Sequence, residues 1–248
     1  MRQTRMARIS YWAVVWFIRL CTFLYVRGPR VVGRENMPQT GGVILVSNHL
    51  NNADPCIIPG ALSRRVITMA KKEMFKWPVV SILFRMIGAF PVDRQGADLG
   101  ALREAQRVVA DGLILLMFPE GTRSRDRVLH RGFPGAALVA YRTGAPLVPI
   151  AITGTEHLRW PWLFFRPFLG PRVTMTIGKP FYPPAVERIT SEAARVATDD
   201  IMVHIAELLP PAYRGEFADE VARRAGAADA VAARGTQGGQ SNTTVLLP

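Results

Sequence analysis

The sequence has few of the residues that build disulfide frameworks and metal clusters. Its 248 residues include two cysteines, Cys21 and Cys56, and four histidines. Two cysteines make neither a disulfide framework nor a metal cluster, so we expect a reducing compartment and no bound metal. No serine or cysteine stands in the glycine-flanked turn of a nucleophile elbow. A covalent enzyme intermediate is therefore not favoured.

Negative charge is also scarce, because 31 lysines and arginines face 19 acidic residues and give a net charge of +12. Such a basic surface fits either nucleic acid or an anionic lipid surface. The sequence has no recognisable nucleic-acid-binding motif, whereas its N-terminal stretch is apolar. We therefore expect a membrane partner and no nucleic acid.

The apolar N-terminal run over 9–26 lacks the features of a cleaved signal peptide. Arg27-Gly28-Pro29-Arg30 follows it in place of a small-residue cleavage site, so we expect the run to be retained. Its eighteen residues would reach about 27 Å as a helix, barely the thickness of a bilayer core, and Arg19 would lie near the middle.

A helical wheel favours an interfacial helix in one leaflet over a membrane span. One side of the wheel carries polar residues, and the rest carries large apolar ones. The polar side holds Arg5, Arg8, Arg19 and Thr22, and the remainder holds Trp16, Phe17, Leu20 and Leu24. A buried N-terminal helix of the domain is the other alternative.

Downstream, strand-like and helix-like segments alternate. The apolar run 42–47 is typical of a strand buried on both faces, as in a parallel sheet covered by helices. Further strands are predicted at 30–36, 66–71, 89–92, 113–118, 146–152 and 173–177, and helices at 77–87, 99–109, 136–143 and 191–209. The predicted fold is α/β, a central, mostly parallel sheet flanked by helices, with an N-terminal membrane-associated helix.

We divide the chain into three parts. Residues 1–28 form the membrane-associating helix, and 29–215 form a single catalytic domain, since the length suits one α/β domain. From 226 to 248 the chain is mostly Ala, Gly, Gln, Ser and Thr without periodicity, which predicts a disordered tail.

Two polar segments follow buried strands. His49 is followed five positions later by Asp54, and a helical turn between them would bring the carboxylate back to the imidazole. An aspartate that fixes one ring nitrogen leaves the other free to take a proton from a hydroxyl. A histidine in a loop is more often structural, so this pair alone is a weak signal.

The second segment, 118–125, reads Phe-Pro-Glu-Gly-Thr-Arg-Ser-Arg. Gly121 permits an unusual backbone angle, while Thr122, Arg123 and Ser124 can donate to phosphate oxygens. The alternative is an exposed loop in which Glu120 pairs with an arginine. Because ligands in open α/β sheets bind beyond the carboxyl ends of the strands, both segments are expected on one rim.

The order of four blocks resembles the glycerophospholipid acyltransferase family, whose best-known members are 1-acylglycerol-3-phosphate acyltransferases. The blocks, which with their flanks span about residues 30–180, are 49–54, 88–94, 118–124 and 147–150. Pro91 and the residues 50–53 depart from the usual family pattern. These departures bear on the substrate more than on the type of reaction.

The resemblance implies that His49 is the general base and Asp54 its orienter. It also implies that Glu120, Gly121, Thr122 and Arg123 bind the acceptor's phosphate. Arg94 of the second block and Lys71 are further candidates for this role. No metal ion or bound cofactor is implied; acyl-CoA or acyl carrier protein serves as co-substrate.

The predicted function is transfer of a fatty acyl group to lysophosphatidic acid, which gives phosphatidic acid, at the cytoplasmic face of the cell membrane by a monotopic or peripheral protein. Other lysophospholipids, glycerol 3-phosphate and glycolipids are alternative acceptors. A noncatalytic lipid-binding membrane module and a hydrolase that uses water as acceptor are alternatives of other classes.

Overall fold

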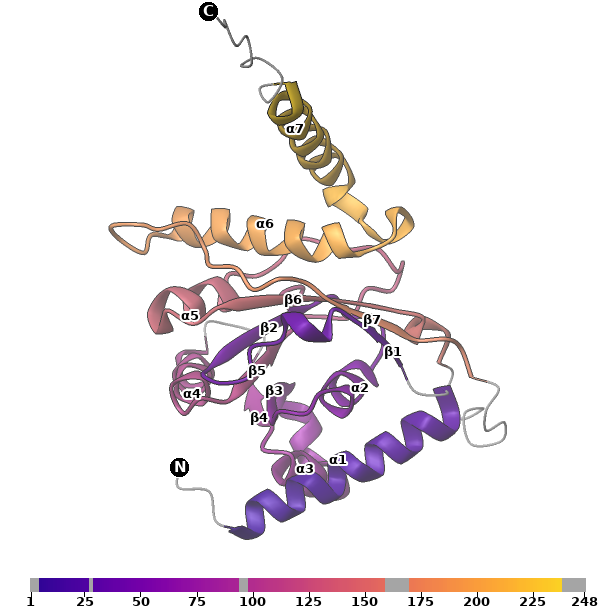
Figure 1. Cartoon of the computed structure of the whole chain (residues 1–248). Coiled ribbons are helices and arrows are strands. Elements are labelled where there is room, and N and C mark those ends of the chain that lie inside the picture. The colour runs from indigo at the N-terminus through magenta and orange to yellow at the C-terminus, as the bar shows by residue number, and fades with distance from the viewer. Residues whose placement is uncertain (1–4, 27–28, 94–97, 159–169, 238–248) are drawn as a thin grey trace, which may run out of the picture.

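The computed structural model of the chain describes residues 5–26, 29–93, 98–158 and 170–237. Its strands are β1 (Arg30–Val32), β2 (Val43–Ser47), β3 (Val66–Lys71), β4 (Phe90–Val92), β5 (Ile114–Met117), β6 (Leu147–Thr153) and β7 (Thr174–Ile177). They form one sheet in the order β1-β7-β6-β2-β5-β3-β4 (Figure 1). The strands from β6 to β4 are parallel, β7 is antiparallel to β6, and β1 is parallel to β7. The prediction of a mostly parallel sheet is confirmed.

Helices connect most of these strands. They are α1 (Arg5–Val26), α2 (Asp54–Ala61), α3 (Pro78–Met86), α4 (Leu99–Ala110), α5 (Gly135–Thr143), α6 (Ser191–Leu208) and α7 (Ala218–Gln237), with short 3-10 turns η1 (Arg34–Asn36), η2 (Lys72–Lys76), η3 (Thr155–His157), η5 (Pro211–Tyr213) and η6 (Gly215–Phe217). Most lie where hydrophobic periodicity predicts them. Gly144 ends α5 in the left-handed conformation, with φ 65°, which glycine adopts without steric cost.

The sheet is buried on both faces. Every residue of β2 and β5 is buried, and successive side chains point to opposite faces. One face packs against α4, α5 and α6, and the other packs against α2 (Figure 1). Because β2 pairs with β5 in parallel register, the segments that leave both strands emerge at one edge of the sheet.

Helix α1 packs against the domain along one side. Tyr11, Val14 and Val15 are buried and pack near α3, whereas Trp16 and Phe17 are 64% and 65% exposed. The expected helix is present, and within the described residues no helix is both long and apolar enough to cross a membrane.

The polar side of α1 is oriented differently from the helical-wheel prediction. An interfacial helix would turn Arg19 to water, yet its guanidinium donates to the backbone carbonyls of Gly60 and Leu62, each at 2.7 Å. Arg19 therefore faces the domain, and the exposed side of the helix is apolar. The side chains of Arg5 and Arg8 lie outside the described residues.

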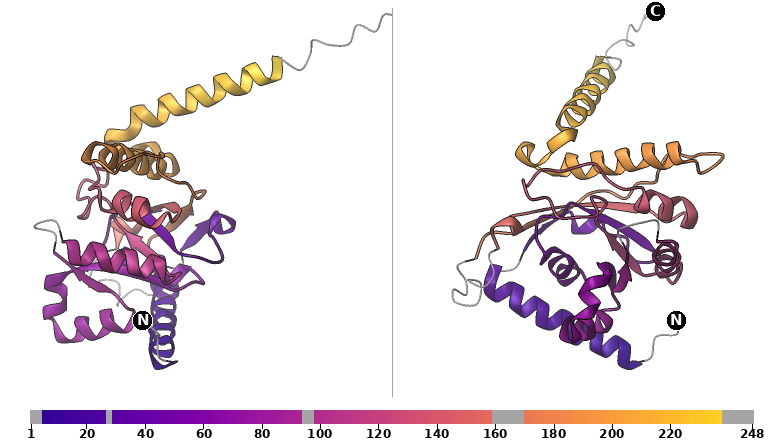
Figure 2. Two further views of the ribbon diagram at one scale, coloured as in Figure 1. Left: turned by 90° about the vertical axis from the view of Figure 1, so that its left-hand side faces the viewer. Right: turned by 180° about the vertical axis from the view of Figure 1, so that it is seen from behind.

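The C-terminal region also differs from the prediction. Residues 226–237, expected to be disordered, continue α7, which projects away from the body of the molecule (Figure 2). The segment lacks an apolar stripe, but it is rich in alanine, which has the highest helix propensity. Residues 238–248 of the predicted tail lie outside the described residues.

Candidate active site

The segment after β2 carries His49 at the carboxyl edge of the sheet. Asn48 fixes where the segment leaves the strand, because its side chain donates to the carbonyl of Ile152 at 2.9 Å and accepts from the amide of the same residue at 2.8 Å. The His49 ring stacks on Phe118, with centroids 4.2 Å apart. Only 6% of His49 is exposed, so the imidazole is buried in a defined orientation.

The predicted pairing of His49 with Asp54 is present. Its Nδ1 lies 2.9 Å from Oδ2 of Asp54, whose side chain is fully buried. The same oxygen accepts from the backbone amides of Leu50 and Asn51, both at 2.7 Å. The residues between the histidine and the aspartate thus form a turn around one carboxylate oxygen. This turn explains why the aspartate follows the histidine by five positions.

This geometry assigns the roles of the two ring nitrogens. An acceptor-only carboxylate requires a proton on Nδ1, so Nε2 carries the lone pair in the neutral ring. Within the described residues Nε2 of His49 accepts no hydrogen bond. The pair can therefore take a proton from a hydroxyl placed at Nε2.

The segment after β5 holds the backbone of His49 from both sides. Glu120 Oε1 accepts from the amide of His49 at 3.1 Å, and its Oε2 accepts from the amide of His130 at 3.3 Å. The amide of Ser124 donates to the carbonyl of His49 at 2.8 Å. The two segments that the sequence singles out are thus joined by hydrogen bonds around one residue.

Glu120 lies beneath the site instead of facing solvent. The side chain is buried, which raises its pKa to about 7, although hydrogen bonds from the amides of His49 and His130 lower the pKa in part. We predicted that Glu120 binds the acceptor. In the structure both of its oxygens are used by the protein, so its contacts are those of a residue that positions the His49 segment.

The turn that follows Glu120 exposes cations. Gly121 has φ 66°, and a Cβ at this position would lie 2.9 Å from the ring of Phe133. Thr122 and Arg123 are exposed, and the described residues include no acidic partner for Arg123. The geometry leaves this guanidinium available to an anion.

Of the other predicted phosphate ligands, Lys71 lies on a strand farther from the His49 segment. Lys71 ends β3, which is two strands from β2 in the sheet, and its amine lies 3.7 Å from Glu73. It shares the carboxyl edge of the sheet with the His49 segment. Arg94 lies outside the described residues.

Sequence reasoning gave no role to three residues that shape the site. They are Asn48, Phe118 and His130. Their contacts join segments that are 69 or more positions apart in the chain, except the short link from Glu120 to His130, so local sequence does not reveal these contacts. Among the described residues, no group of His, Cys, Asp and Glu could hold a metal ion.

Comparisons with known proteins show the family of the chain. A family model described as Acyltransferase matches residues 28–153, just over half of the chain. The chain is 29% identical over 184 residues to a 1-acyl-sn-glycerol-3-phosphate acyltransferase of Bacillus subtilis, which covers 73% of this chain and 88% of that protein.

Other relatives are longer than the matched region. The chain is 35% identical over 150 residues to a protein of the same name from Limnanthes douglasii, but spans about half of that protein's length, with 59% of this chain and 52% of the relative covered. It also resembles the crystal structure of the 1-acyl-sn-glycerophosphate (LPA) acyltransferase PlsC from Thermotoga maritima. The TM-score is 0.61 at 27% identity, and 81% of each chain is covered.

The site and the comparisons lead to one conclusion. The four blocks that carry the resemblance lie in or directly after strands of the mostly parallel sheet. The family model covers all four blocks and the whole of β6. This chain is an enzyme of the acyltransferase family.

Proposed function

We propose that this enzyme transfers a fatty acyl group from acyl-CoA or acyl carrier protein to the free hydroxyl of lysophosphatidic acid. The product is phosphatidic acid. The observation that carries the proposal is the 2.9 Å contact between His49 Nδ1 and Asp54 Oδ2, which leaves Nε2 as a base. The names of the relatives support the choice of acceptor.

The reaction needs one base and correct placement of two substrates. His49 Nε2 takes the proton of the acceptor hydroxyl as its oxygen attacks the thioester carbonyl. Collapse of the tetrahedral intermediate breaks the carbon–sulfur bond, and the leaving thiolate takes the proton back from the imidazolium. An ester and a free thiol result, so no oxidant, metal ion or bound cofactor is required.

The acceptor's phosphate is proposed to bind the exposed turn at Thr122 and Arg123. A guanidinium binds phosphate through paired hydrogen bonds, and this one is exposed in the turn directly after Glu120. Because Glu120 contacts the His49 amide at 3.1 Å, phosphate binding at the turn would place the glycerol hydroxyl near Nε2. Lys71 and Arg94 are proposed as secondary contacts.

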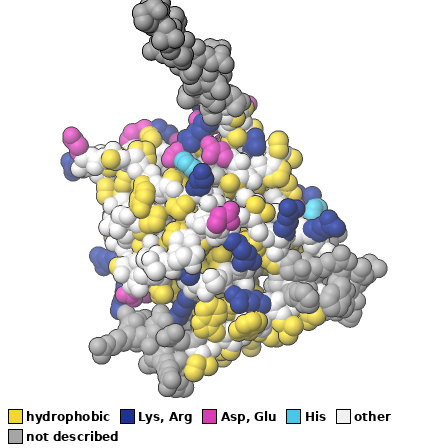
Figure 3. Space-filling view, in the orientation of Figure 1, with side chains coloured by type: hydrophobic (Ala, Val, Ile, Leu, Met, Phe, Trp, Pro, Cys, Tyr) yellow, Lys and Arg dark blue, Asp and Glu magenta, His cyan; other side chains and the backbone are white. Residues whose placement is uncertain are grey.

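We further propose a monotopic or peripheral location at the cytoplasmic face of the cell membrane. Hydrophobic side chains gather at the lower edge of the molecule, over α1 (Figure 3). The most exposed of them on α1, α3 and the residue before α3 are Ile9, Trp16, Phe17, Leu20, Trp77, Val79 and Ile82. Since α1 and α3 pack together, this apolar face suits a lipid surface.

Acyl transfer by the full-length, detergent-solubilised protein tests the proposal. Radiolabelled acyl-CoA and acyl carrier protein would be offered with lysophosphatidic acid, other lysophospholipids and glycerol 3-phosphate. We expect phosphatidic acid, and at least a thousandfold lower kcat in His49→Ala. Release of free fatty acid without an ester would contradict transfer, and equal activity of the variant would overturn the role of His49.

A further inference from the structure

Helix α2 links the His49–Asp54 pair to the N-terminal helix α1. Asp54 is its first residue, so the position of the carboxylate depends on how this short helix is held. The helix has eight residues, with Pro59 in its interior. A helix of this length is marginal in isolation, and an interior proline removes one backbone hydrogen bond. Its orientation must therefore come from contacts with the rest of the chain.

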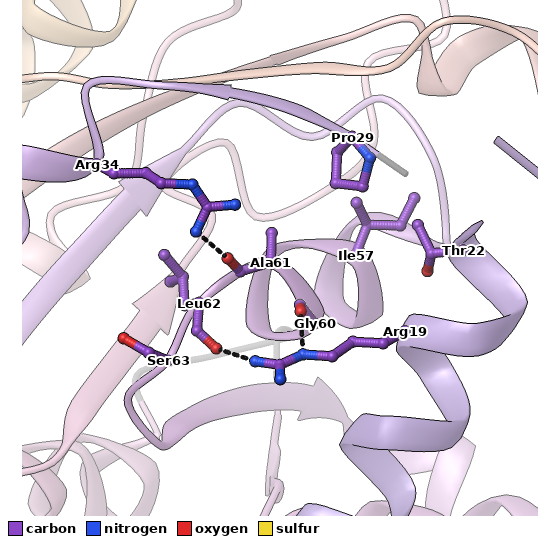
Figure 4. Close-up of a pocket in the computed structure, with 9 residues that line it drawn as sticks. All are labelled: Arg19, Thr22, Pro29, Arg34, Ile57, Gly60, Ala61, Leu62 and Ser63. Carbon is purple, nitrogen blue, oxygen red and sulfur yellow. Dashed lines mark hydrogen bonds between the residues drawn. The ribbon is translucent and has the colours of Figure 1, made fainter. Parts of the chain in front are cut away.

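The C-terminal end of α2 is held by two arginines from earlier segments. Arg19 of α1 donates from Nε to the carbonyl of Gly60 and from Nη2 to that of Leu62, both at 2.7 Å. Arg34 donates from Nη1 to the carbonyl of Ala61 at 3.1 Å. Three consecutive carbonyls at the end of the helix are thus bound by two guanidiniums (Figure 4).

These contacts suit the electrostatics of a helix end. The last carbonyls of a helix lack partners within the helix and carry its negative dipole end, so cations are favoured there. At the other end of α2, the negative Asp54 lies in the first turn, which is also the favoured arrangement. Charges at both ends therefore hold the helix that carries the carboxylate.

Arg19 is itself held firmly. Its guanidinium lies 5.8 Å from the ring centroid of Trp12 and 5.2 Å from that of Trp16. A cavity of about 350 Å³ adjoins the arginines and the end of α2, and none of the described residues that line it is acidic. Water would be the main substitute donor if the Arg19 side chain were removed.

Helix α1 has a second hydrogen-bonded link to the domain. The hydroxyl of Tyr11 accepts from the amide of Val66 at 2.9 Å, at the start of β3. Close packing adds to this link, since a Cβ at Gly60 would lie 3.2 Å from Ile18. The family match begins at residue 28. The α1 residues that make these contacts therefore lie outside the matched region, while their partners lie within it.

We propose that Arg19, with Arg34, is a positioning residue for the reaction: by binding the C-terminal end of α2 it holds Asp54 against His49. Helix α1 is then part of the catalytic unit as well as a membrane contact. The proposal rests on the proposed function in one respect, namely that Asp54 orients the base.

Arg19→Ala in the full-length protein tests this through activity. We expect kcat to fall on the order of tenfold to a hundredfold, because small displacements of catalytic groups have effects of this size, while KM for the acceptor changes less than twofold. Arg34→Ala, which loses a single exposed contact, should show a smaller loss of kcat. Arg19→Lys should recover part of the loss, since an ammonium donates but lacks the planar fork.

Arg214→Ala is the matched control. Its Nε donates to the carbonyl of Leu209 at 3.0 Å and so binds the end of α6 in the same way, but α6 carries no residue of the site. It should reduce the thermal midpoint without a selective loss of kcat. If Arg214→Ala and Arg19→Ala reduce kcat equally at equal loss of stability, the role of Arg19 is merely structural and the proposal fails.

A second readout needs no substrate. A histidine Nδ1 proton bonded to a carboxylate gives a downfield proton NMR signal, which His49→Ala would assign. We expect this signal to broaden or vanish in Arg19→Ala and to persist in Arg214→Ala. Persistence in Arg19→Ala would overturn the proposal even if wild-type activity is confirmed. Its loss would support the proposal even if the acceptor is not lysophosphatidic acid.

Discussion

At the residue scale, the arrangement of hydrogen bonds around His49 distinguishes reacting groups from groups that hold them. Asp54 contacts the ring of His49, Glu120 accepts from its backbone amide, and Ser124 donates to its backbone carbonyl. The preceding residue, Asn48, is held by hydrogen bonds to the backbone of Ile152. Within the described part of the chain, the ring nitrogen Nε2 of His49 is left without a hydrogen-bond partner. The orientation of His49 therefore depends on several residues that contact its backbone or the residue before it and do not contact the ring.

The raised pKa of Glu120 leads to a prediction about stability and pH. Its pKa is about 7 in the folded protein against an ordinary value of 4.5, so the folded state binds the proton more tightly than the unfolded state. Ionisation then costs stability as pH rises through this interval. Relative to Glu120→Gln, the wild type should lose about 2 to 3 kcal/mol of unfolding free energy between pH 5 and pH 8.

Denaturant unfolding of both proteins at several pH values measures this difference. Other titrating groups are common to the two proteins and cancel. The amide of glutamine also faces two N–H donors with only one oxygen, which adds a cost that does not vary with pH. Parallel pH dependences for the two proteins would show that Glu120 does not titrate in this range.

At the element scale, the exposed sides of α1 and α3 form an apolar face. Phe17 is 65% exposed and Val79 is 70% exposed. Because both side chains lie open to solvent, an aspartate in either position should leave the fold intact. The change would nevertheless oppose contact with lipid.

We predict that Phe17→Asp combined with Val79→Asp weakens binding to vesicles by at least tenfold. Two apolar side chains lose their burial in the interface, and two negative charges approach the anionic headgroups. Cosedimentation with vesicles of phosphatidylcholine and phosphatidylglycerol measures the effect. Val196→Asp, on the far side of the sheet in α6 and 45% exposed, is the control. Unchanged cosedimentation of the double variant would contradict the membrane role of this face.

At the scale of the whole molecule, α7 projects away from the sheet and the helices that cover it (Figures 1 and 2). In the part of the chain that the structure describes, α7 contacts the rest of the domain through its first turns and the residue before it. Phe217 and Val221 are buried, and Arg224 donates to Asp200 at 2.7 Å. The first turns of the helix therefore belong to the packed domain.

Two truncations should separate these parts of α7. Ending the chain after residue 227 should leave activity within twofold and the thermal midpoint nearly unchanged. Ending it after residue 217 removes Val221 and Arg224 and should destabilise the protein by about 2 kcal/mol, the scale of one buried aliphatic side chain. Circular dichroism melts and the acyl-transfer assay measure both. A large loss from the shorter deletion would show that the projecting part of the helix contributes to the fold.

The sequence by itself determined much of this protein. Short buried apolar runs predicted the strands β2 and β5, because strands covered on both faces carry such runs, and Gly112 and Gly144 marked the ends of α4 and α5. The sequence also revealed the spacing of His49 and Asp54 and the cations after Glu120. Each of these groups lies within a few residues of the end of one strand, so a short stretch of sequence contains it. The helix over residues 226–237 was not predicted, because its composition lacks the apolar periodicity that marks a packed helix.

Only the tertiary structure decided how these local features combine. It placed the Glu120 carboxylate under the His49 backbone, and it turned Arg19 toward the end of α2 instead of toward water. Hydrogen bonds between segments that are tens of residues apart depend on strand order and helix packing. A local pattern contains neither, and for this reason the residues that hold the site emerge only when the chain is folded.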